Sequence, residues 1–126
     1  MFAVKGLDHV ALTVRDVKRS IAWYRDIFGL ERRYEEMWGD YPVMMFAGDS
    51  GLALFEARGE VSAAPDSRGA AIMRHVAFQV DRVNFLKAQE SLRACGIEFE
   101  FQDHAISQSI YLRDPDGYEL ELTTYE

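Results

Sequence analysis

The sequence predicts an α+β protein built from two similar modules, each with a strand, a helix and then three further strands. An internal repeat carries this prediction: residues 7–17 read LDHVALTVRDV, and residues 73–83 read MRHVAFQVDRV. Aligning the two segments places His9 on His75, and each segment continues into a helical pattern that ends at a glycine. Because a repeat reflects the architecture, we expect two modules of roughly 60 residues, over about 1–57 and 73–126.

In the first module, residues 7–14 alternate with β-branched residues, as a strand does. Asp16 is a good helix N-cap, and Gly29 is suited to the left-handed stop after the helix. Three short strand-like runs follow, and they end the module. We expect these strands near 31–37, 42–47 and 51–57.

The second module repeats this order after a linker. Residues 58–72 are rich in alanine, glycine, serine and proline, and this composition indicates the linker. Asp81 begins the second predicted helix, which ends at Cys95 before Gly96. The predicted strands of this module are 73–80, 97–101, 107–113 and 118–124.

The last hairpin also predicts its own register. Asp114-Pro115-Asp116-Gly117 is typical of a type I turn with glycine in the left-handed position. In that register Asp114 faces Tyr118, and Tyr111 faces Glu121. Glu121 then shares one face of its strand with Glu119 and Thr123, while Leu120 and Leu122 occupy the other.

Composition narrows the function. The 126 residues are 48% hydrophobic and 28% charged, as in a globular domain, and no apolar run approaches the ~20 residues of a membrane span. The net charge of −7 argues against a nucleic-acid or anionic-membrane surface. The single cysteine excludes an intrachain disulfide, and no signal-peptide pattern is visible, so we expect a cytoplasmic protein. A small enzyme, a small-molecule binder or an interaction module remains.

Four residues are candidate metal ligands. His9 and His75 occupy equivalent positions of the duplicated strands, and imidazole is the commonest metal ligand side chain. Glu121 lies opposite its leucine neighbours, and two histidines with one carboxylate form the facial set of non-haem iron and related sites. Glu56, in phase with Leu52 and Leu54, is a candidate fourth ligand.

The sequence resembles the vicinal oxygen chelate superfamily, which includes glyoxalase I, extradiol dioxygenases, methylmalonyl-CoA epimerase, fosfomycin-resistance enzymes and bleomycin-resistance proteins. The resemblance is carried by residues 7–30, 74–80 and 109–122. It implies that paired βαβββ modules form a cupped, half-barrel mixed sheet with helices outside. It further implies a divalent zinc, nickel, iron, manganese or cobalt ion inside the cup, and a homodimer. The implied metal ligands are His9, Glu56, His75 and Glu121.

The resemblance leaves three functions open for a small-molecule substrate. The first is an isomerase, lyase or epimerase, in which the Glu56 or Glu121 carboxylate shuttles a proton next to a carbonyl. The second is an extradiol-type ring-cleavage dioxygenase, in which Tyr111 and His104 handle protons near the metal. The third is a metal-free binding protein of the bleomycin-resistance type. Thr13 and Glu60 stand where glutathione-using glyoxalases carry arginine and asparagine, which disfavours lactoylglutathione.

Overall fold

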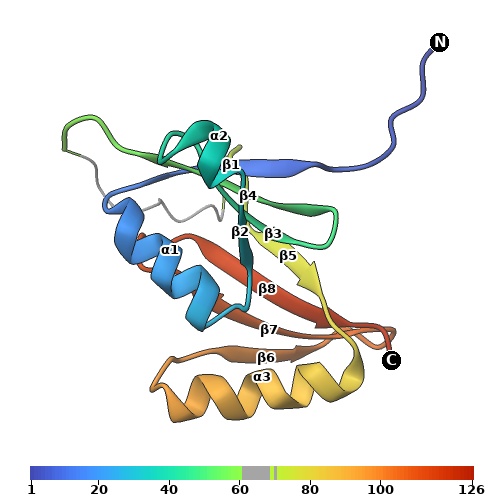
Figure 1. Ribbon diagram of the computed structural model, residues 1–126. Helices are drawn as coiled ribbons and strands as arrows, with labels where there is room; N and C mark the ends of the chain where they lie inside the picture. Colours follow the sequence, from blue (N-terminus) through green and yellow to red (C-terminus); the bar gives the residue numbers. More distant parts are fainter. Residues whose placement is uncertain (61–68, 70) are drawn as a thin grey trace. The chain divides into compact units, whose positions relative to one another are not determined.

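The computed structural model describes residues 1–60, 69 and 71–126 (Figure 1). The chain divides into two compact units, Met1–Ser62 and Ala63–Glu126. Most of the predicted linker, residues 61–68 and 70, lies outside the described residues. Each unit contains one four-stranded mixed sheet, and the predicted α+β fold of two βαβββ modules is confirmed.

Unit 1 places its first and last strands side by side. The strand order is β1-β4-β3-β2, in which β1 runs parallel to β4 and the other neighbours are antiparallel. The elements of this unit are β1 (His9–Val14), α1 (Val17–Asp26), β2 (Glu31–Arg33), α2 (Glu35–Trp38), β3 (Val43–Ala47) and β4 (Ser50–Glu56).

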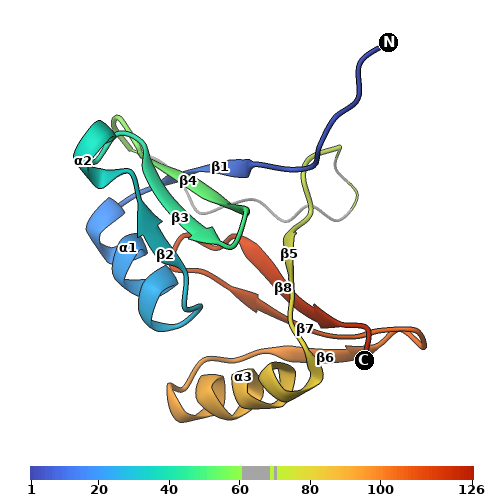
Figure 2. The same ribbon diagram turned by 45° about the vertical axis from the view of Figure 1, so that its right-hand side comes forward.

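Unit 2 has the same topology without the additional short helix. Its strand order is β5-β8-β7-β6, with β5 parallel to β8. The α3 helix runs alongside its sheet in Figures 1 and 2. The elements of this unit are β5 (Val76–Gln79), α3 (Arg82–Ala94), β6 (Glu100–Asp103), β7 (Gln108–Arg113) and β8 (Glu119–Thr124).

The predicted helix caps are confirmed in both units. The Asp16 carboxylate accepts a hydrogen bond from the backbone N–H of Arg19 at the start of α1, and Asp81 accepts one from Asn84 at the start of α3. Gly29 and Gly96, with φ of +67° and +70°, follow the two helices in the left-handed conformation that glycine adopts most readily. The helix boundaries were therefore readable from local chemistry.

The predicted hairpin register is also confirmed. The N–H of Gly117 donates to the carbonyl of Asp114 at 3.0 Å, and the N–H of Asp114 donates to Tyr118. Tyr111 is directly opposite Glu121 in the β7–β8 ladder. The turn thus sets which side chains meet on this part of the sheet.

Three predicted strands differ from the structure by three residues or more at one end. The strand expected over 73–80 spans only Val76–Gln79, so His75 lies just before it. The strand expected over 31–37 ends at Arg33, because Tyr34 adopts a left-handed conformation (φ 64°) and its carbonyl accepts the N–H groups of Met37 and Trp38 at the start of α2. The strand expected over 97–101 begins at Glu100. The N–H of Ile97 is already used at the end of α3, where it donates to the carbonyl of Leu92.

The two faces of each sheet differ in what they contact. Leu52 and Leu54 of β4 are buried on the face that contacts α1, and Leu120 and Leu122 occupy the corresponding face beside α3. His9, Ala11 and Thr13 alternate with the buried residues of β1 and lie on the opposite face. No helix in the described part of the chain is long and apolar enough to cross a membrane.

Candidate metal-binding site

Unit 2 brings His75 and Glu121 into direct contact. His75 immediately precedes β5, and Glu121 lies on the adjacent parallel strand β8. Nε2 of His75 is 2.9 Å from Oε1 of Glu121, whose side chain is only 11% exposed. Nδ1 of the same imidazole is 4.0 Å from Oε2 of Glu119. A carboxylate this buried requires a cation or strong hydrogen-bond donors. The imidazole of His75 is one such partner.

The other oxygen of Glu121 is held by a serine. Oγ of Ser109 lies 2.7 Å from Oε2 of Glu121 and 2.9 Å from Oγ1 of Thr123. Ser109 and Thr123 are register partners on β7 and β8, and both are buried. Sequence reasoning missed Ser109, although its position two residues before Tyr111 places both on one face of the strand.

Tyr111 extends this cluster toward His104. The Tyr111 ring is 5.6 Å from the His75 ring, and its hydroxyl lies 3.0 Å from Nε2 of His104. Burial, and next the negative charge of Glu121, raise the pKa of Tyr111 above its ordinary value. The phenol therefore keeps its proton at neutral pH in this environment. The structure thus brings together His75, Glu121, Tyr111 and His104.

His9 of unit 1 lies on the face of its sheet that is turned away from α1. Its side chain is 40% exposed, and its Nδ1 lies 2.7 Å from Oδ2 of Asp8. A carboxylate on Nδ1 fixes the tautomer in which Nε2 is the nitrogen available for a metal. Asp8 was not singled out from the sequence, although it directly precedes the histidine.

Glu56 does not join His9. The side chain of Glu56 is in phase with Leu52 and Leu54, so it lies on the helix side of the sheet rather than on the His9 side. Its register partner is Val14, five positions from His9 and about 16 Å along the strand at ~3.3 Å per residue. Its Oε1 accepts the backbone N–H of Val17 at 3.0 Å, at the first turn of α1.

The counterpart of Glu121 in unit 1 is an alanine. Ala77 pairs with Glu121 in unit 2, and the equivalent residue Ala11 pairs with Ala53 in unit 1. Ala53 belongs to an apolar cluster with Met44 and Phe46, against which Phe55 packs. The expected fourth carboxylate is therefore replaced on this face by apolar packing.

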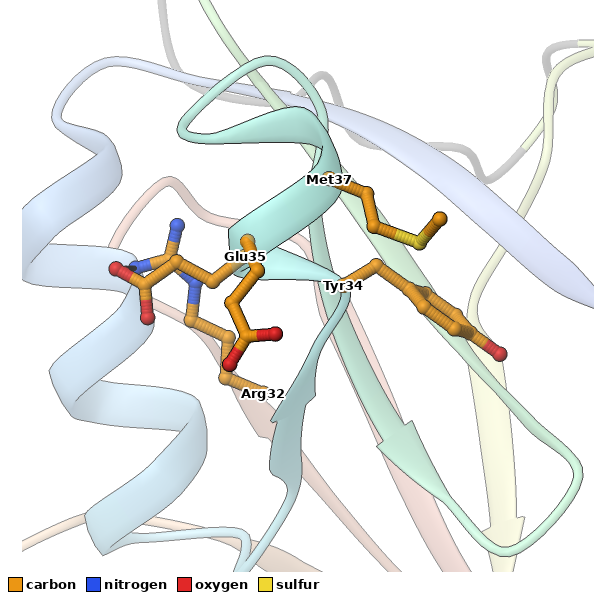
Figure 3. Close-up of a pocket in the computed structure, with 5 residues that line it drawn as sticks. Arg32, Tyr34, Glu35 and Met37 are labelled. Atoms are coloured by element: carbon orange, nitrogen blue, oxygen red, sulfur yellow. Dashed lines mark ion pairs between the residues drawn. The ribbon is translucent and has the colours of Figure 1, made fainter.

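A pocket of about 350 Å³ lies elsewhere in unit 1, around α2 (Figure 3). Figure 3 shows Tyr34 and Met37 projecting to one side of this helix, whereas Arg32 lies on the other. Arg32 is already paired with Glu35 at 3.1 Å and with Asp40 at 2.8 Å. These two carboxylates neutralise the charge of Arg32. None of the predicted site residues lines this pocket, whose lining residues are Arg32, Tyr34, Glu35, Glu36 and Met37.

The donor set of unit 2 fits part of a divalent metal site. Within residues 1–60, 69 and 71–126, no group of three or more histidine, cysteine, aspartate and glutamate side chains is gathered as a metal site. The pair of His75 and Glu121 nevertheless places one imidazole nitrogen beside one carboxylate oxygen. These are donor types used by zinc, iron, manganese, nickel and cobalt sites, so the residues of unit 2 fit part of such a site.

Comparison with known proteins places the chain in a family. The family model described as "Glyoxalase/Bleomycin resistance protein/Dioxygenase superfamily" matches residues 6–122. Metallothiol transferase FosB of Staphylococcus haemolyticus is 32% identical over 127 residues, which cover 96% of this chain and 84% of that protein. Catechol-2,3-dioxygenase of Bacillus subtilis is 26% identical over 121 residues, which cover 92% of this chain and 40% of that protein.

A solved structure agrees with the fold. The crystal structure of a glyoxalase/dioxygenase from Nostoc punctiforme superposes with a TM-score of 0.79 at 22% identity, covering 97% of this chain and 92% of that one. Residues 6–122, which the family model matches, include His9, His75 and Glu121. The chain therefore belongs to the glyoxalase/bleomycin resistance protein/dioxygenase superfamily, as its repeated histidine strands had indicated.

Proposed function

We propose that this protein is a metal-dependent enzyme that acts on a small substrate bound through adjacent oxygen atoms. The proposal rests on the 2.9 Å approach of His75 Nε2 to Glu121 Oε1, beside a tyrosine that hydrogen-bonds a second histidine. His75 and Glu121 would hold the metal, and the family resemblance adds His9 as the third ligand. The name of the staphylococcal relative, a metallothiol transferase, supports metal dependence.

The residues around the ligands supply proton chemistry. A bound divalent metal would act as a Lewis acid that stabilises negative charge on substrate oxygens. Tyr111, whose raised pKa keeps it protonated, would donate a hydrogen bond to such an oxygen. His104, whose Nε2 lies 3.0 Å from the phenol, would accept or return the proton through Tyr111.

This geometry changes the order of the candidate reactions. Proton transfer by an isomerase, lyase or epimerase is favoured where Glu56 is a fourth ligand and proton shuttle. The position of Glu56 on the helix side of its sheet removes that support. The contact between His104 and Tyr111 instead favours deprotonation of a vicinal diol, as in extradiol-type ring cleavage, and the match to a catechol dioxygenase supports it.

Thiol transfer is the second candidate. Its support is the 32% identity to a metallothiol transferase over nearly the whole chain. Besides Tyr111, two carboxylates face His75, those of Glu119 and Glu121, and they would repel an anionic substrate group unless the metal compensated their charge. We place ring cleavage first because the contact between His104 and Tyr111 supplies a proton acceptor for a vicinal diol, whereas thiol transfer rests on sequence identity.

We also propose that the enzyme works as a homodimer. β1 and β5 are edge strands of their sheets, and edges of this kind are commonly covered by a partner. Light scattering at micromolar concentration would then report about twice the chain mass of 14.4 kDa. A stable monomer would contradict this part of the proposal without affecting the ligand assignment.

Substitutions of two histidines in unit 2 test whether metal binding and proton transfer belong to different residues. The protein is purified without chelators, and metal content is measured for wild type, His75→Ala and His104→Ala. We expect His75→Ala to lose the metal, because it removes a ligand, whereas His104→Ala keeps the metal and loses turnover. A wild-type protein that binds no divalent ion, or a His75→Ala variant that keeps it, would favour the metal-free binding protein.

Oxygen uptake with a panel of catechols then separates the reactions. In the iron-loaded protein, ring cleavage predicts uptake that falls in Tyr111→Phe and survives in Glu56→Gln. Isomerase chemistry predicts instead that Glu56→Gln abolishes exchange of a proton next to a substrate carbonyl. Consumption of a thiol in the presence of an electrophilic substrate, without oxygen uptake, would establish the transferase.

A further inference from the structure

We infer that Ser109, supported by Thr123, is a positioning residue that leaves a single oxygen of Glu121 available to a metal. The inference rests on the proposed function, because it concerns how a proposed ligand is held. Neither residue was among the candidate ligands or proton-transfer groups. Both lie on the same face of the sheet as Glu121, at register-paired positions of β7 and β8.

The contacts are short and shielded from water. Ser109 is fully buried, and its Oγ lies 2.7 Å from Oε2 of Glu121. The same Oγ lies 2.9 Å from Oγ1 of Thr123, which is 8% exposed. Hydrogen bonds to a carboxylate are among the stronger ones in proteins, and they strengthen further where water is excluded.

The number of available hydroxyl protons fixes which group donates and which accepts in each of these hydrogen bonds. Serine has one hydroxyl proton, and an ionised carboxylate can only accept. The Ser109 proton therefore goes to Glu121, and the Thr123 hydroxyl donates its own proton to Ser109. The carbonyl of Gln108, at 3.4 Å from Thr123 Oγ1, is the weaker competing acceptor.

The network divides the roles of the two carboxylate oxygens. Oε2 is held by Ser109, while Oε1 faces His75 Nε2 at 2.9 Å. A carboxylate held in this way is already oriented to bind through Oε1 alone, and it loses little conformational freedom on binding. Without Ser109 the carboxylate can rotate, and both of its oxygens compete for the metal.

Comparison of the two units shows that the threonine hydroxyl and the carboxylate are both present in unit 2 and both absent at the equivalent positions of unit 1. Thr123 pairs with Gln79 in unit 2, and the equivalent pair in unit 1 is Phe55 with Thr13. Phe55 therefore occupies the position of Thr123, just as Ala53 occupies that of Glu121. Unit 1 has neither the carboxylate nor the threonine hydroxyl that supports it in unit 2, although its strands pair in the same register.

The main test measures metal affinity rather than turnover. Affinity for Co²⁺ is determined by calorimetry for wild type and Ser109→Ala, together with the visible absorption spectrum of the bound ion. We expect about 10- to 100-fold weaker binding, the usual effect of losing a residue that orients a ligand. We also expect a changed spectrum, because Glu121 is free to bind through both oxygens. Ser20→Ala is the matched control, since it removes another fully buried serine hydroxyl, from α1.

Two substitutions of Thr123 separate hydrogen bonding from packing. Thr123→Val keeps the shape and removes the hydroxyl, whereas Thr123→Ser keeps the hydroxyl and removes a methyl group. We expect Thr123→Val to weaken Co²⁺ binding, by less than Ser109→Ala does, and Thr123→Ser to remain close to wild type. The reverse order would overturn the inference, and it decides the question even if Ser109→Ala fails to fold.

The outcome is distinguishable from a failure of the proposed function. If wild type binds no Co²⁺, the metal proposal itself is wrong. If wild type binds Co²⁺ and His75→Ala does not, while Ser109→Ala binds with unchanged affinity and spectrum, the metal proposal stands and the role of Ser109 is wrong.

Discussion

The two units share one topology but carry opposite chemistry on the sheet face turned away from their helix. In unit 2 this face holds Glu121, which accepts a hydrogen bond from Ser109, and Tyr111, whose ring contacts His75. In unit 1 the corresponding face holds Ala53 in an apolar cluster with Phe46. A duplicated module can therefore keep its fold while one of its sheet faces changes from polar to apolar.

The contacts on the helix side of each sheet explain why both units keep the same fold. Leu52 and Leu54 of β4 correspond to Leu120 and Leu122 of β8, and all four are buried. An aspartate caps the helix in each unit by accepting a backbone N–H three residues along the chain. These contacts stabilise each module independently of what the other face carries.

Placing a carboxylate on the apolar face should be the most disruptive test of this comparison. Ala53→Glu puts a charge at the position equivalent to Glu121, but among Met44 and Phe46 and without a serine donor. We expect unfolding free energy to fall by about 3–5 kcal/mol, as for an uncompensated buried charge. Urea denaturation of the metal-free protein measures the effect.

The control for that substitution lies on the neighbouring strand. Ala11 is the register partner of Ala53 and is exposed. Ala11→Glu should change unfolding free energy by no more than about 0.5 kcal/mol, as for most surface substitutions. If Ala53→Glu is as well tolerated as Ala11→Glu, the apolar face of unit 1 can accept a charged ligand, and the contrast between the units is weaker than the structure indicates.

A smaller effect is expected from substitution of Glu56, whose carboxylate accepts a backbone N–H at the first turn of α1. Glu56→Ala removes the acceptor of the Val17 N–H and should cost about 1 kcal/mol of unfolding free energy, as for the loss of a helix cap. Glu56→Gln keeps an acceptor oxygen and should cost less. Both variants should bind Co²⁺ as wild type does. A loss of Co²⁺ affinity in Glu56→Gln at unchanged stability would restore Glu56 as a ligand.

The smallest effect concerns the pH dependence of unit 2. The pKa of Tyr111 is raised by burial and by Glu121, so the folded state holds this proton more tightly than the unfolded state does. Its contribution to stability is fully present below the unfolded tyrosine pKa of about 10 and is lost as pH rises through the higher folded value. In metal-free protein, Tyr111→Phe should reduce the fall in stability above that pH, measured by urea denaturation across alkaline pH. An unchanged alkaline profile would show that Tyr111 titrates as an ordinary surface tyrosine.

Much of this protein was determined by its sequence alone. The repeat, the aspartate caps, the glycine stops and the Tyr111–Glu121 register all follow from residues close together in the chain. A cap needs only a side chain and an N–H three residues away, and a tight turn sets the pairing of the strands it joins. His75 and Glu121 could be named as candidate ligands from the repeat and from the alternation of the last strand, but their contact depends on the pairing of β5 with β8.

Other features were decided only by tertiary structure. Glu56 illustrates this. Its phase with Leu52 and Leu54 is visible in the sequence, but only the packing of β4 against α1 shows that this phase is the helix side of the sheet. The short helix α2 accompanies a left-handed Tyr34 and the ion pairs of Arg32 with Glu35 and Asp40, which bring three segments together. The hydrogen bond of Ser109 to Glu121 and that of His104 to Tyr111 likewise join side chains from different parts of the sheet. Such contacts depend on side-chain direction across paired strands, which a single sequence does not specify.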